Sequence, residues 1–357
     1  MNLAVKLREH VHAQPYSAIV ISKRSNLLYF SEGFRGEGAL YLTADRRVIV
    51  TDSRYTEQAG IEAPGFEVVC CGSGKGYADC AAELACGDKI SILYYEPDAL
   101  FVKDFQGIQK ILPKTVEYIP LDGVPEKMRA VKTPKEIVKM RRAADITSEA
   151  FSAVLPRIKE GMTEKELQTE IDFAMIRLGA DRPAFETIVA SGENGSLCHA
   201  IPGCRRLTRG DLITMDFGAR VEGYCSDMTR TVALGEPDPE KRRIFETVLR
   251  AQKLGEKELR PGVQGKEPHR IVTDYIDSCG YKNCFIHGLG HSVGIDIHEK
   301  PSLSLRGEEK MQPGMVITVE PGIYIEGKCG VRIENTCLIT DSGCEPLTTA
   351  DKDLIIL

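Results

Sequence analysis

The chain has 357 residues, enough for two domains, and its 42% apolar and 27% charged residues are typical of globular proteins rather than disordered ones. A formal net charge of −6 gives no basic surface for nucleic acid or an anionic membrane. No stretch approaches the roughly 18 apolar residues of a membrane span or the apolar core of a signal peptide, so we expect a cytoplasmic protein. The twelve cysteines are scattered and none shows C-x-x-C spacing, so we expect reduced thiols.

Residues 1–125 are predicted to form an α/β domain, because short β-branched or aromatic runs alternate with helical segments. The expected strands are Ser17–Ser22, Asn26–Phe30, Ala39–Leu42, Val48–Thr51, Glu67–Cys71 and Ile90–Tyr95. The expected helices are Arg54–Ala59, Tyr77–Ala85 and Ala99–Leu112. Turn residues in Leu121–Pro125 mark the end of this domain.

Residues 126–357 are predicted to form a second domain in which helices precede strand pairs. One helix should run from Pro134 to about Ile158, and a capping box of Thr163 and Glu166 should start the next. Two further helices are expected near residues 240–259 and 265–278. Each pair of helices is followed by a predicted hairpin, so we expect an internal structural duplication.

The two predicted hairpins carry four carboxylates. These are Asp216 in residues 212–219, Asp227 in 224–232, Glu320 in 316–320 and Glu334 in 331–338. The first pair of strands is joined near residues 221–223, and the second pair is joined across 321–322 and 327–330.

Alternation along the strands predicts which side chains share a face, because residues two apart point to the same side. It places a threonine beside each carboxylate: Thr214 with Asp216, Thr229 with Asp227, Thr318 with Glu320, and Thr336 with Glu334. The opposite faces are apolar and should belong to the core; they carry Ile213, Met215, Phe217, Ile317, Val319, Val331 and Ile333. Buried carboxylates need a cationic partner or a metal.

His291 completes a predicted ligand set with these four carboxylates. A single aspartate in a strand is usually an edge or turn residue, but four together change that interpretation. Carboxylates with one imidazole and no thiolate cluster suit divalent ions such as Mn²⁺, Co²⁺ or Zn²⁺. Four negative charges balance two divalent ions, so we expect two ions, with Mn²⁺ favoured, and a hydroxide nucleophile near neutral pH.

Four of the seven histidines fall in two short segments, 198–202 and 287–299. They are His199, His287, His291 and His298. A lone histidine is more often a satisfied polar residue than a catalyst, but this concentration favours function. Glycines at 288, 290 and 294 miss the dinucleotide-binding spacing, and we expect them to make room for a close-packed metal site.

With these residues in view, the chain resembles the creatinase/methionine-aminopeptidase superfamily of "pita-bread" metallopeptidases, and within it the Xaa-Pro aminopeptidase and prolidase branch. The resemblance rests on six motifs in order: His199-Ala-Ile-Pro, Met215-Asp-Phe-Gly-Ala, Tyr224-Cys-Ser-Asp-Met-Thr-Arg-Thr, His287-Gly-Leu-Gly-His, Glu320-Pro-Gly-Ile-Tyr and Gly330-Val-Arg-Ile-Glu-Asn. It implies a creatinase-like N-terminal α/β domain followed by a catalytic pita-bread domain with pseudo-two-fold symmetry.

The resemblance also implies a role for each site residue. Asp227 and Glu334 would bridge both metals, Asp216 would chelate one, and His291 with Glu320 would complete the other. His298 would stabilise the oxyanion, His199 would contact the residue after the scissile bond, and Glu320 would move a proton to the proline nitrogen. Arg332 would orient a ligand carboxylate and His287 would shape the substrate pocket. Thr229 and Thr336 would support the ligands.

The implied activity is hydrolysis of the bond between an N-terminal residue and proline in short peptides, by a homodimer that binds no nucleic acid. Some prolidases carry an arginine after a His-Glu-x-Pro segment, where it can meet a dipeptide's carboxylate, but here that position is Ser302. This favours an Xaa-Pro aminopeptidase, with an Xaa-Pro dipeptidase as the alternative. A non-catalytic binding module on the same fold is a remote alternative, because such proteins usually lose ligands.

Overall fold

The computed structural model describes residues 3–357. Contacts between residues divide the chain into two compact units, Met1–Arg129 and Ala130–Leu357. The sequence pattern places the boundary slightly earlier, after residue 125, and helix α6 (Val124–Ala130) spans the difference.

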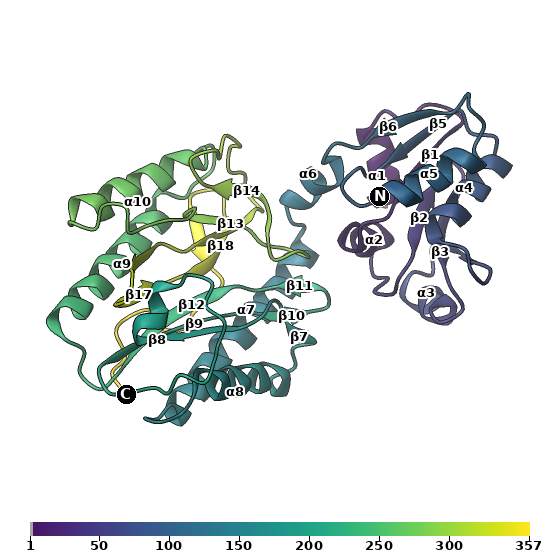
Figure 1. The fold of residues 1–357 in the computed structure, drawn as a ribbon. Coiled ribbons are helices and arrows are strands. Elements are labelled where there is room, and N and C mark those ends of the chain that lie inside the picture. The colour runs from purple at the N-terminus through teal and green to yellow at the C-terminus, as the bar shows by residue number, and fades with distance from the viewer. Residues whose placement is uncertain (1–2) are drawn as a thin grey trace. The chain divides into compact units, whose positions relative to one another are not determined.

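A mixed six-stranded sheet forms the N-terminal unit, in the order β4-β3-β2-β1-β5-β6 (Figure 1). Its strands are β1 (Ser17–Ile21), β2 (Ala39–Leu42), β3 (Arg47–Thr51), β4 (Glu67–Cys70), β5 (Ile92–Tyr95) and β6 (Glu117–Pro120). Its other helices are α1 (Leu3–His10), α2 (Arg24–Ser31), α3 (Thr56–Glu62), α4 (Tyr77–Gly87) and α5 (Val102–Ile111). Alanines of α4 and Ile108 of α5 pack on Tyr41 and Val48 of the sheet, so these two helices cover one face.

The predicted strand Asn26–Phe30 is wrong, because these residues belong to helix α2. The carboxylate of Glu96 accepts hydrogen bonds from the backbone N–H groups of Ser22 (2.5 Å) and Lys23 (2.8 Å), just before the helix, and from the amide of Asn26 (2.6 Å). An anion at a helix N-terminus is favourable. This partner lies 70 residues from Asn26 in the sequence, so the local pattern could not reveal it. Helix α1 and strand β6 were not predicted either.

The C-terminal unit consists of two successive halves with the same strand order. The first half contains α7 (Pro134–Val154), η1 (Leu155–Arg157), α8 (Glu164–Arg177), β7 (Arg182–Pro183), β8 (Ile188–Ser191), η2 (Gly192–Ser196), β9 (Asp211–Phe217), β10 (Ala219–Val221), β11 (Tyr224–Cys225) and β12 (Met228–Leu234). The second contains α9 (Pro239–Glu258), α10 (Lys266–Ser278), β13 (Gly290–Ser292), β14 (Glu299–Leu303), β15 (Val316–Val319), β16 (Gly322–Ile325), β17 (Cys329–Arg332), β18 (Asn335–Ile339) and β19 (Cys344–Pro346).

Antiparallel neighbours β8-β9-β12 in the first half match β13-β15-β18 in the second. Each half also carries a small inserted hairpin, β10–β11 or β16–β17. Helices α7 and α8 pack on the first sheet and α9 and α10 on the second, each pair forming its own apolar core (Figure 1). The expected duplication is therefore present as a repeated topology, and the apolar strand faces predicted as core are buried.

Close approach of backbones makes each hairpin possible. At the first turn, Glu222 and Gly223 both have positive φ (47° and 88°), which suits a two-residue hairpin connection. A Cβ atom at Gly218 would clash with the carbonyl of Ser226, so glycine is required where the two strands cross.

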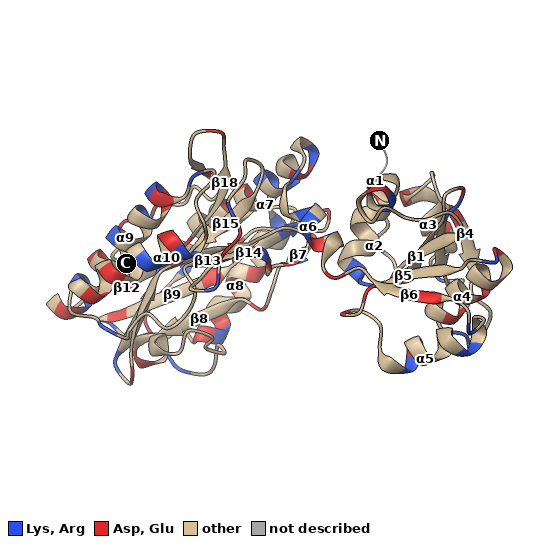
Figure 2. Cartoon of the chain, turned by 90° about the horizontal axis from the view of Figure 1, so that it is seen from above, with Lys and Arg blue, Asp and Glu red and all other residues tan. Residues whose placement is uncertain are grey.

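Lys and Arg are interspersed with Asp and Glu along the helices of both units (Figure 2). Among the described residues, no helix combines the length and apolarity needed to cross a membrane. All twelve cysteines are free thiols, and five of them are buried: Cys71, Cys80, Cys225, Cys329 and Cys337.

Candidate metal centre

The residues predicted as metal ligands line one cavity of about 340 Å³ in the C-terminal unit, together with the other three histidines and Arg332. Asp216 comes from β9, and Asp227 lies between β11 and β12. Glu320 directly follows β15, and Glu334 lies between β17 and β18. His291 is in β13. The two halves of the domain thus contribute their carboxylates to one place.

The imidazole of His291 faces the carboxylates with its unprotonated nitrogen. Nδ1 lies 3.2 Å from the carbonyl oxygen of Ser292 and so carries the proton of the neutral ring. Nε2 lies 3.3 Å from Oε1 of Glu320 and 3.6 Å from Oδ2 of Asp227. Burial lowers the pKa of His291, which keeps the ring neutral near pH 7. A lone pair directed at two carboxyl groups is the arrangement expected of a histidine that binds a cation together with them.

Asp227, Glu320 and Glu334 resist ionisation without cations. Burial and the nearby charges of other carboxylates raise the pKa of Asp227 and Glu334 well above the usual range. Burial likewise raises the pKa of Glu320 to about 8. Among the described residues, Oδ1 of Asp216 and Oε1 of Glu334 are buried and have no hydrogen-bond partner. Ligand atoms of Asp227, His291 and Glu334 all lie within 4.8 Å of one another. The set therefore fits hard or borderline divalent cations.

Threonine hydroxyls support the glutamates, but only partly in the predicted pairs. Thr318 donates to Oε1 of Glu320 at 3.1 Å, as alternation along the strand predicts. Thr229 donates to Oε2 of Glu334 at 2.6 Å, across the two hairpins, instead of pairing with Asp227.

The other two threonines that were predicted to share a face with a carboxylate form their hydrogen bonds elsewhere. Thr336 donates to the backbone carbonyl of Asp227 at 2.8 Å, and Thr214 shares a hydrogen bond with Thr231 at 2.9 Å. Thr231 lies directly opposite Thr214 on the paired strand β12. Thr336 on β18 instead reaches the other hairpin, because β12 and β18 pack side by side. Period-two alternation describes one strand and cannot predict these crossed contacts.

Arg332 holds the carboxylate of Asp216, a predicted ligand, from the opposite hairpin. Its Nη2 donates to Oδ2 of Asp216 at 2.6 Å, and both side chains are largely buried. Its Nε donates to Thr229 at 3.1 Å, and its Nη1 donates to the hydroxyl of Tyr324 at 2.8 Å and the carbonyl of Cys198 at 3.2 Å. The guanidinium is thus fully engaged in positioning groups of the site.

Tyr324 is a site residue that the sequence interpretation missed. Its hydroxyl lies 2.9 Å from Nε2 of His287, whose Nδ1 lies 2.8 Å from the carbonyl of Gly288. Burial raises the pKa of Tyr324 to about 12, and burial together with the charge of Arg332 lowers the pKa of His287 to about 4. Tyr324 is the last residue of the motif Glu320-Pro-Gly-Ile-Tyr, and its place in that motif was the signal that could have identified it.

His298 and His199 lie in the wall of the same cavity. The ring of His298 meets His291 edge-on, with centroids 4.5 Å apart, and burial with the neighbouring imidazoles lowers its pKa. The side chain of His199 is exposed. Three apolar side chains that were not predicted complete the wall: Phe185, Ile188 and Ile297. They provide a surface suited to an apolar ring.

The glycines around His291 stand where a Cβ atom would meet a neighbouring segment. A Cβ atom at Gly290 would clash with the backbone carbonyl of Thr318 on β15. A Cβ atom at Gly294 would lie 2.6 Å from the carboxylate of Glu299. Glycine at both positions therefore allows close packing beside the site, against backbone at Gly290 and against a side chain at Gly294.

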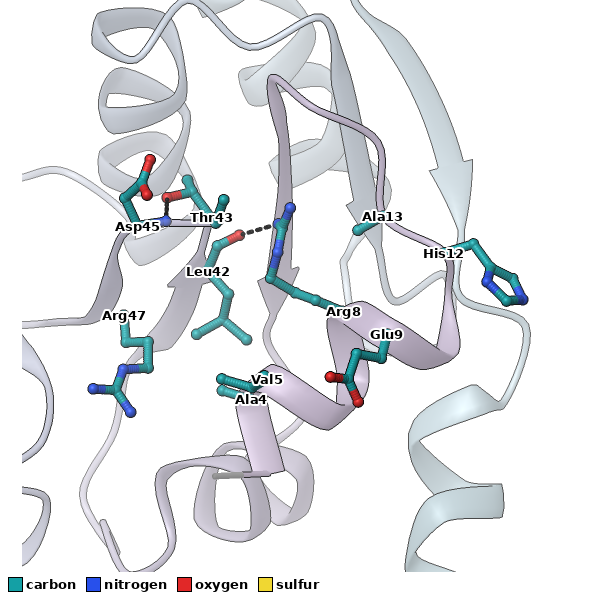
Figure 3. Close-up of a pocket in the computed structure, with 11 residues that line it drawn as sticks. Ala4, Val5, Arg8, Glu9, His12, Ala13, Leu42, Thr43, Asp45 and Arg47 are labelled. Carbon is teal, nitrogen blue, oxygen red and sulfur yellow. Dashed lines mark hydrogen bonds between the residues drawn. The ribbon is translucent and has the colours of Figure 1, made fainter. Parts of the chain in front are cut away.

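A second cavity, of about 820 Å³, lies in the N-terminal unit between α1 and the turn after β2 (Figure 3). Arg8 projects beside it and donates to the carbonyl of Leu42 at 3.4 Å. Across residues 3–357, the one group of acidic, imidazole or thiol side chains close enough to hold an ion is in the C-terminal cavity. The chemistry therefore belongs there, although that cavity is smaller.

Comparisons with known proteins agree with this arrangement. The family model described as "Metallopeptidase family M24" matches residues 138–341, and that of the "Creatinase/Prolidase N-terminal domain" matches residues 5–131. The chain belongs to metallopeptidase family M24. Both the predicted superfamily and the predicted order of a creatinase-like domain and a pita-bread domain are confirmed.

Solved M24 structures resemble the whole chain. The Xaa-Pro dipeptidase from Bacillus anthracis is 36% identical, with a TM-score of 0.93 over 99% of this chain and 100% of that one. The X-Pro aminopeptidase from Thermotoga maritima is also 36% identical, with a TM-score of 0.89 over 96% and 97%. A Pyrococcus furiosus protein named Xaa-Pro dipeptidase is 42% identical over 67% of this chain and 69% of its own length.

Proposed function

We propose that this M24 metallopeptidase is a two-metal Xaa-Pro peptidase, which hydrolyses the bond between an N-terminal residue and proline. The observation that carries the proposal is the convergence of Asp216, Asp227, His291, Glu320 and Glu334 on one cavity, with buried oxygen atoms that have no protein partner. The names of the relatives from Bacillus anthracis and Thermotoga maritima support proline as the second residue.

Two divalent cations, with Mn²⁺ favoured over Co²⁺ or Zn²⁺, would be held by these five side chains, and when bound they supply a Lewis acid for the peptide carbonyl and hydroxide near neutral pH. Arg332 holds Asp216 in place, and Thr318 and Thr229 hold Glu320 and Glu334. These contacts fix the carboxylates before substrate arrives, which lowers the reorganisation needed for reaction.

The histidines and Glu320 are proposed to act on the substrate itself. Neutral His298, beside His291, donates a hydrogen bond to the oxyanion, and His199 contacts the residue after the scissile bond. Glu320 carries a proton to the proline nitrogen as that nitrogen leaves. Proline makes a tertiary amide with a restricted φ, which general peptidases fit poorly, and the apolar wall can accept its ring.

We further propose that the substrates are peptides longer than dipeptides. Arg332 is the one permanently cationic side chain among the described residues that line the cavity, and it is already bound to Asp216 and Tyr324. Ser302 shares a hydrogen bond with Ser304 at 3.1 Å and offers no charge to a dipeptide's carboxylate. The dipeptidase remains the alternative, because two of the three named relatives are called dipeptidases.

A mass-spectrometric digest tests these proposals. The Mn²⁺-loaded protein is incubated with Ala-Pro, Ala-Pro-Ala and the control Ala-Ala-Ala. Release of alanine from Ala-Pro-Ala identifies an aminopeptidase, and cleavage of Ala-Pro alone identifies a dipeptidase. The variant Ser302→Arg should raise the relative kcat/KM for Ala-Pro. Absence of cleavage with Mn²⁺, Co²⁺ and Zn²⁺ would support the non-catalytic binding module. The homodimer remains a prediction that light scattering can test.

A further inference from the structure

We propose that Glu164 is a positioning residue for His199. Glu164 is the first residue of helix α8 and is fully buried, with 0% of its surface exposed. It lies outside the cavity lining, and the sequence motifs give it no role. Its partners are in Ser191–Gly203, the segment that carries His199 and is called the His199 loop below.

The carboxylate of Glu164 binds the loop at both ends. Near the start of the loop, it accepts hydrogen bonds from the backbone N–H of Ser191 (2.8 Å), the hydroxyl of Ser191 (2.7 Å) and the amide of Asn194 (3.1 Å). At the other end, it accepts from the backbone N–H of Gly203 at 3.4 Å. A single buried anion therefore closes the loop into a fixed arch around His199.

The backbone of helix α8 strengthens the same closure. The N–H of Glu164 donates to the carbonyl of Arg205 at 3.0 Å, and the N–H of Lys165 donates to the carbonyl of Gly203 at 3.1 Å. N–H groups in the first turn of a helix have no carbonyl partner within the helix, so the loop provides partners for these two. The loop is thus docked on a rigid element through both its donors and its acceptors.

The other side of the loop rests on the metal centre. Gly195 packs backbone to backbone against Gly330, where a Cβ atom on either residue would clash. The carbonyl of Cys198 accepts from Nη1 of Arg332 at 3.2 Å. The His199 loop therefore spans from α8 to the arginine that holds a ligand carboxylate. Because the side chain of His199 is exposed, the loop backbone sets its position.

This inference rests on the proposed function, because His199 needs a substrate to contact. Glu164→Gln keeps the shape but replaces one acceptor oxygen with an N–H₂ group that faces donors. The matched control is Glu166→Gln on the same helical turn, where the carboxylate is exposed and bonds only Thr163 among the described residues. Both are made in the full chain and loaded with Mn²⁺.

Kinetics with Ala-Pro-Ala test the functional effect. We expect Glu164→Gln to lower kcat/KM by about 10–100-fold, because small misplacements of groups that contact the substrate slow the reaction strongly. The loss should be divided between kcat and KM in the same proportion as the loss caused by His199→Ala. Metal content should stay unchanged, and Glu166→Gln should match the unmodified protein. In a His199→Ala background, Glu164→Gln should change kcat/KM less than twofold. Equal losses in both backgrounds, or no loss at all, overturn the inference.

Hydrogen exchange tests the anchor without catalysis. Glu164→Gln and the milder Asn194→Leu, which removes donors from a half-buried side chain, should speed amide exchange in residues 191–203 and leave α9 and α10 unchanged. Unchanged exchange in the loop of both variants overturns the inference even if the enzyme is active. Failure of the unmodified protein to cleave any proline peptide instead counts against the proposed function, so the two failures are distinguishable.

Discussion

Removal of the cations should make stability depend on pH through Glu320. The pKa of this carboxyl is about 8 in the folded metal-free protein, against 4.5 when unfolded. The folded state therefore binds the proton more tightly, and stability falls as pH rises from 4.5 to 8. Linkage between these two values gives a loss of about 3 kcal/mol between pH 5.5 and pH 8. Asp227 and Glu334 act in the same direction, because their pKa values are also raised.

His287 opposes this trend and must be separated from it. Its pKa falls from 6.5 to about 4 on folding, so its neutral folded form gains stability as pH rises, by about 1 kcal/mol over the same interval. Urea unfolding of EDTA-treated protein at pH 5.5 and pH 8 measures the net effect. The same measurement on Glu320→Gln removes only the carboxyl, so the two proteins should differ in their pH response by about 3 kcal/mol.

Addition of Mn²⁺ should stabilise the protein more at pH 8 than at pH 5.5, because cations bind the ionised carboxylates. Two outcomes would refute the reasoning. One is a metal-free stability whose pH response is the same in Glu320→Gln as in the unmodified protein. The other is equal stabilisation by Mn²⁺ at both pH values.

Further variants test individual contacts. Glu334→Ala should abolish turnover and lower the metal content measured by mass spectrometry; full activity would contradict its role as a ligand. His298→Ala should lower kcat more than metal content, and equal loss of both would make it structural. Tyr324→Phe should lower kcat/KM by about 10–100-fold, as expected for groups that orient ligands, with the metal retained; an unchanged value argues against this role. Lys132→Met breaks a buried ion pair with Glu299 (3.1 Å) beside His298 and should cost about 3–5 kcal/mol in urea unfolding; a cost below 1 kcal/mol refutes it.

The sequence could predict the features that depend on local patterns, such as helix caps, turns and the alternation of apolar residues along strands. The predicted capping box of Thr163 and Glu166 starts α8, and Pro134 is the first residue of α7, as expected. The turn at residues 222–223 closes the first hairpin. Apolar residues alternate with carboxylates, so the ligand-bearing strands were identifiable. Candidate functional residues in short motifs, such as His291, could likewise be identified before their positions in space were known.

Contacts between distant elements were beyond the sequence pattern. The bond between Arg332 and Asp216 joins residues 116 apart, and Thr229 reaches Glu334 across 105 residues. Glu164 is buried because its partners come from a loop that follows a strand of the same half. In each case, the partner of a buried polar group is distant in the sequence and comes close only when the domain folds.

The repeated topology explains why the two proposed cations would need both halves of the domain. In each half, one carboxylate lies in or directly after the strand before the inserted hairpin: Asp216 in β9 and Glu320 after β15. The other lies between the inserted hairpin and the strand that follows it: Asp227 before β12 and Glu334 before β18. The segments that carry Asp227 and Glu334 lie against each other. The N–H of Glu334 donates to the carbonyl of Thr229 (3.0 Å), and Thr336 donates to the carbonyl of Asp227. One half alone offers two negative charges, which balance one divalent ion. The second pair of carboxylates would supply the charge for another ion, and the packed duplication brings the two pairs together.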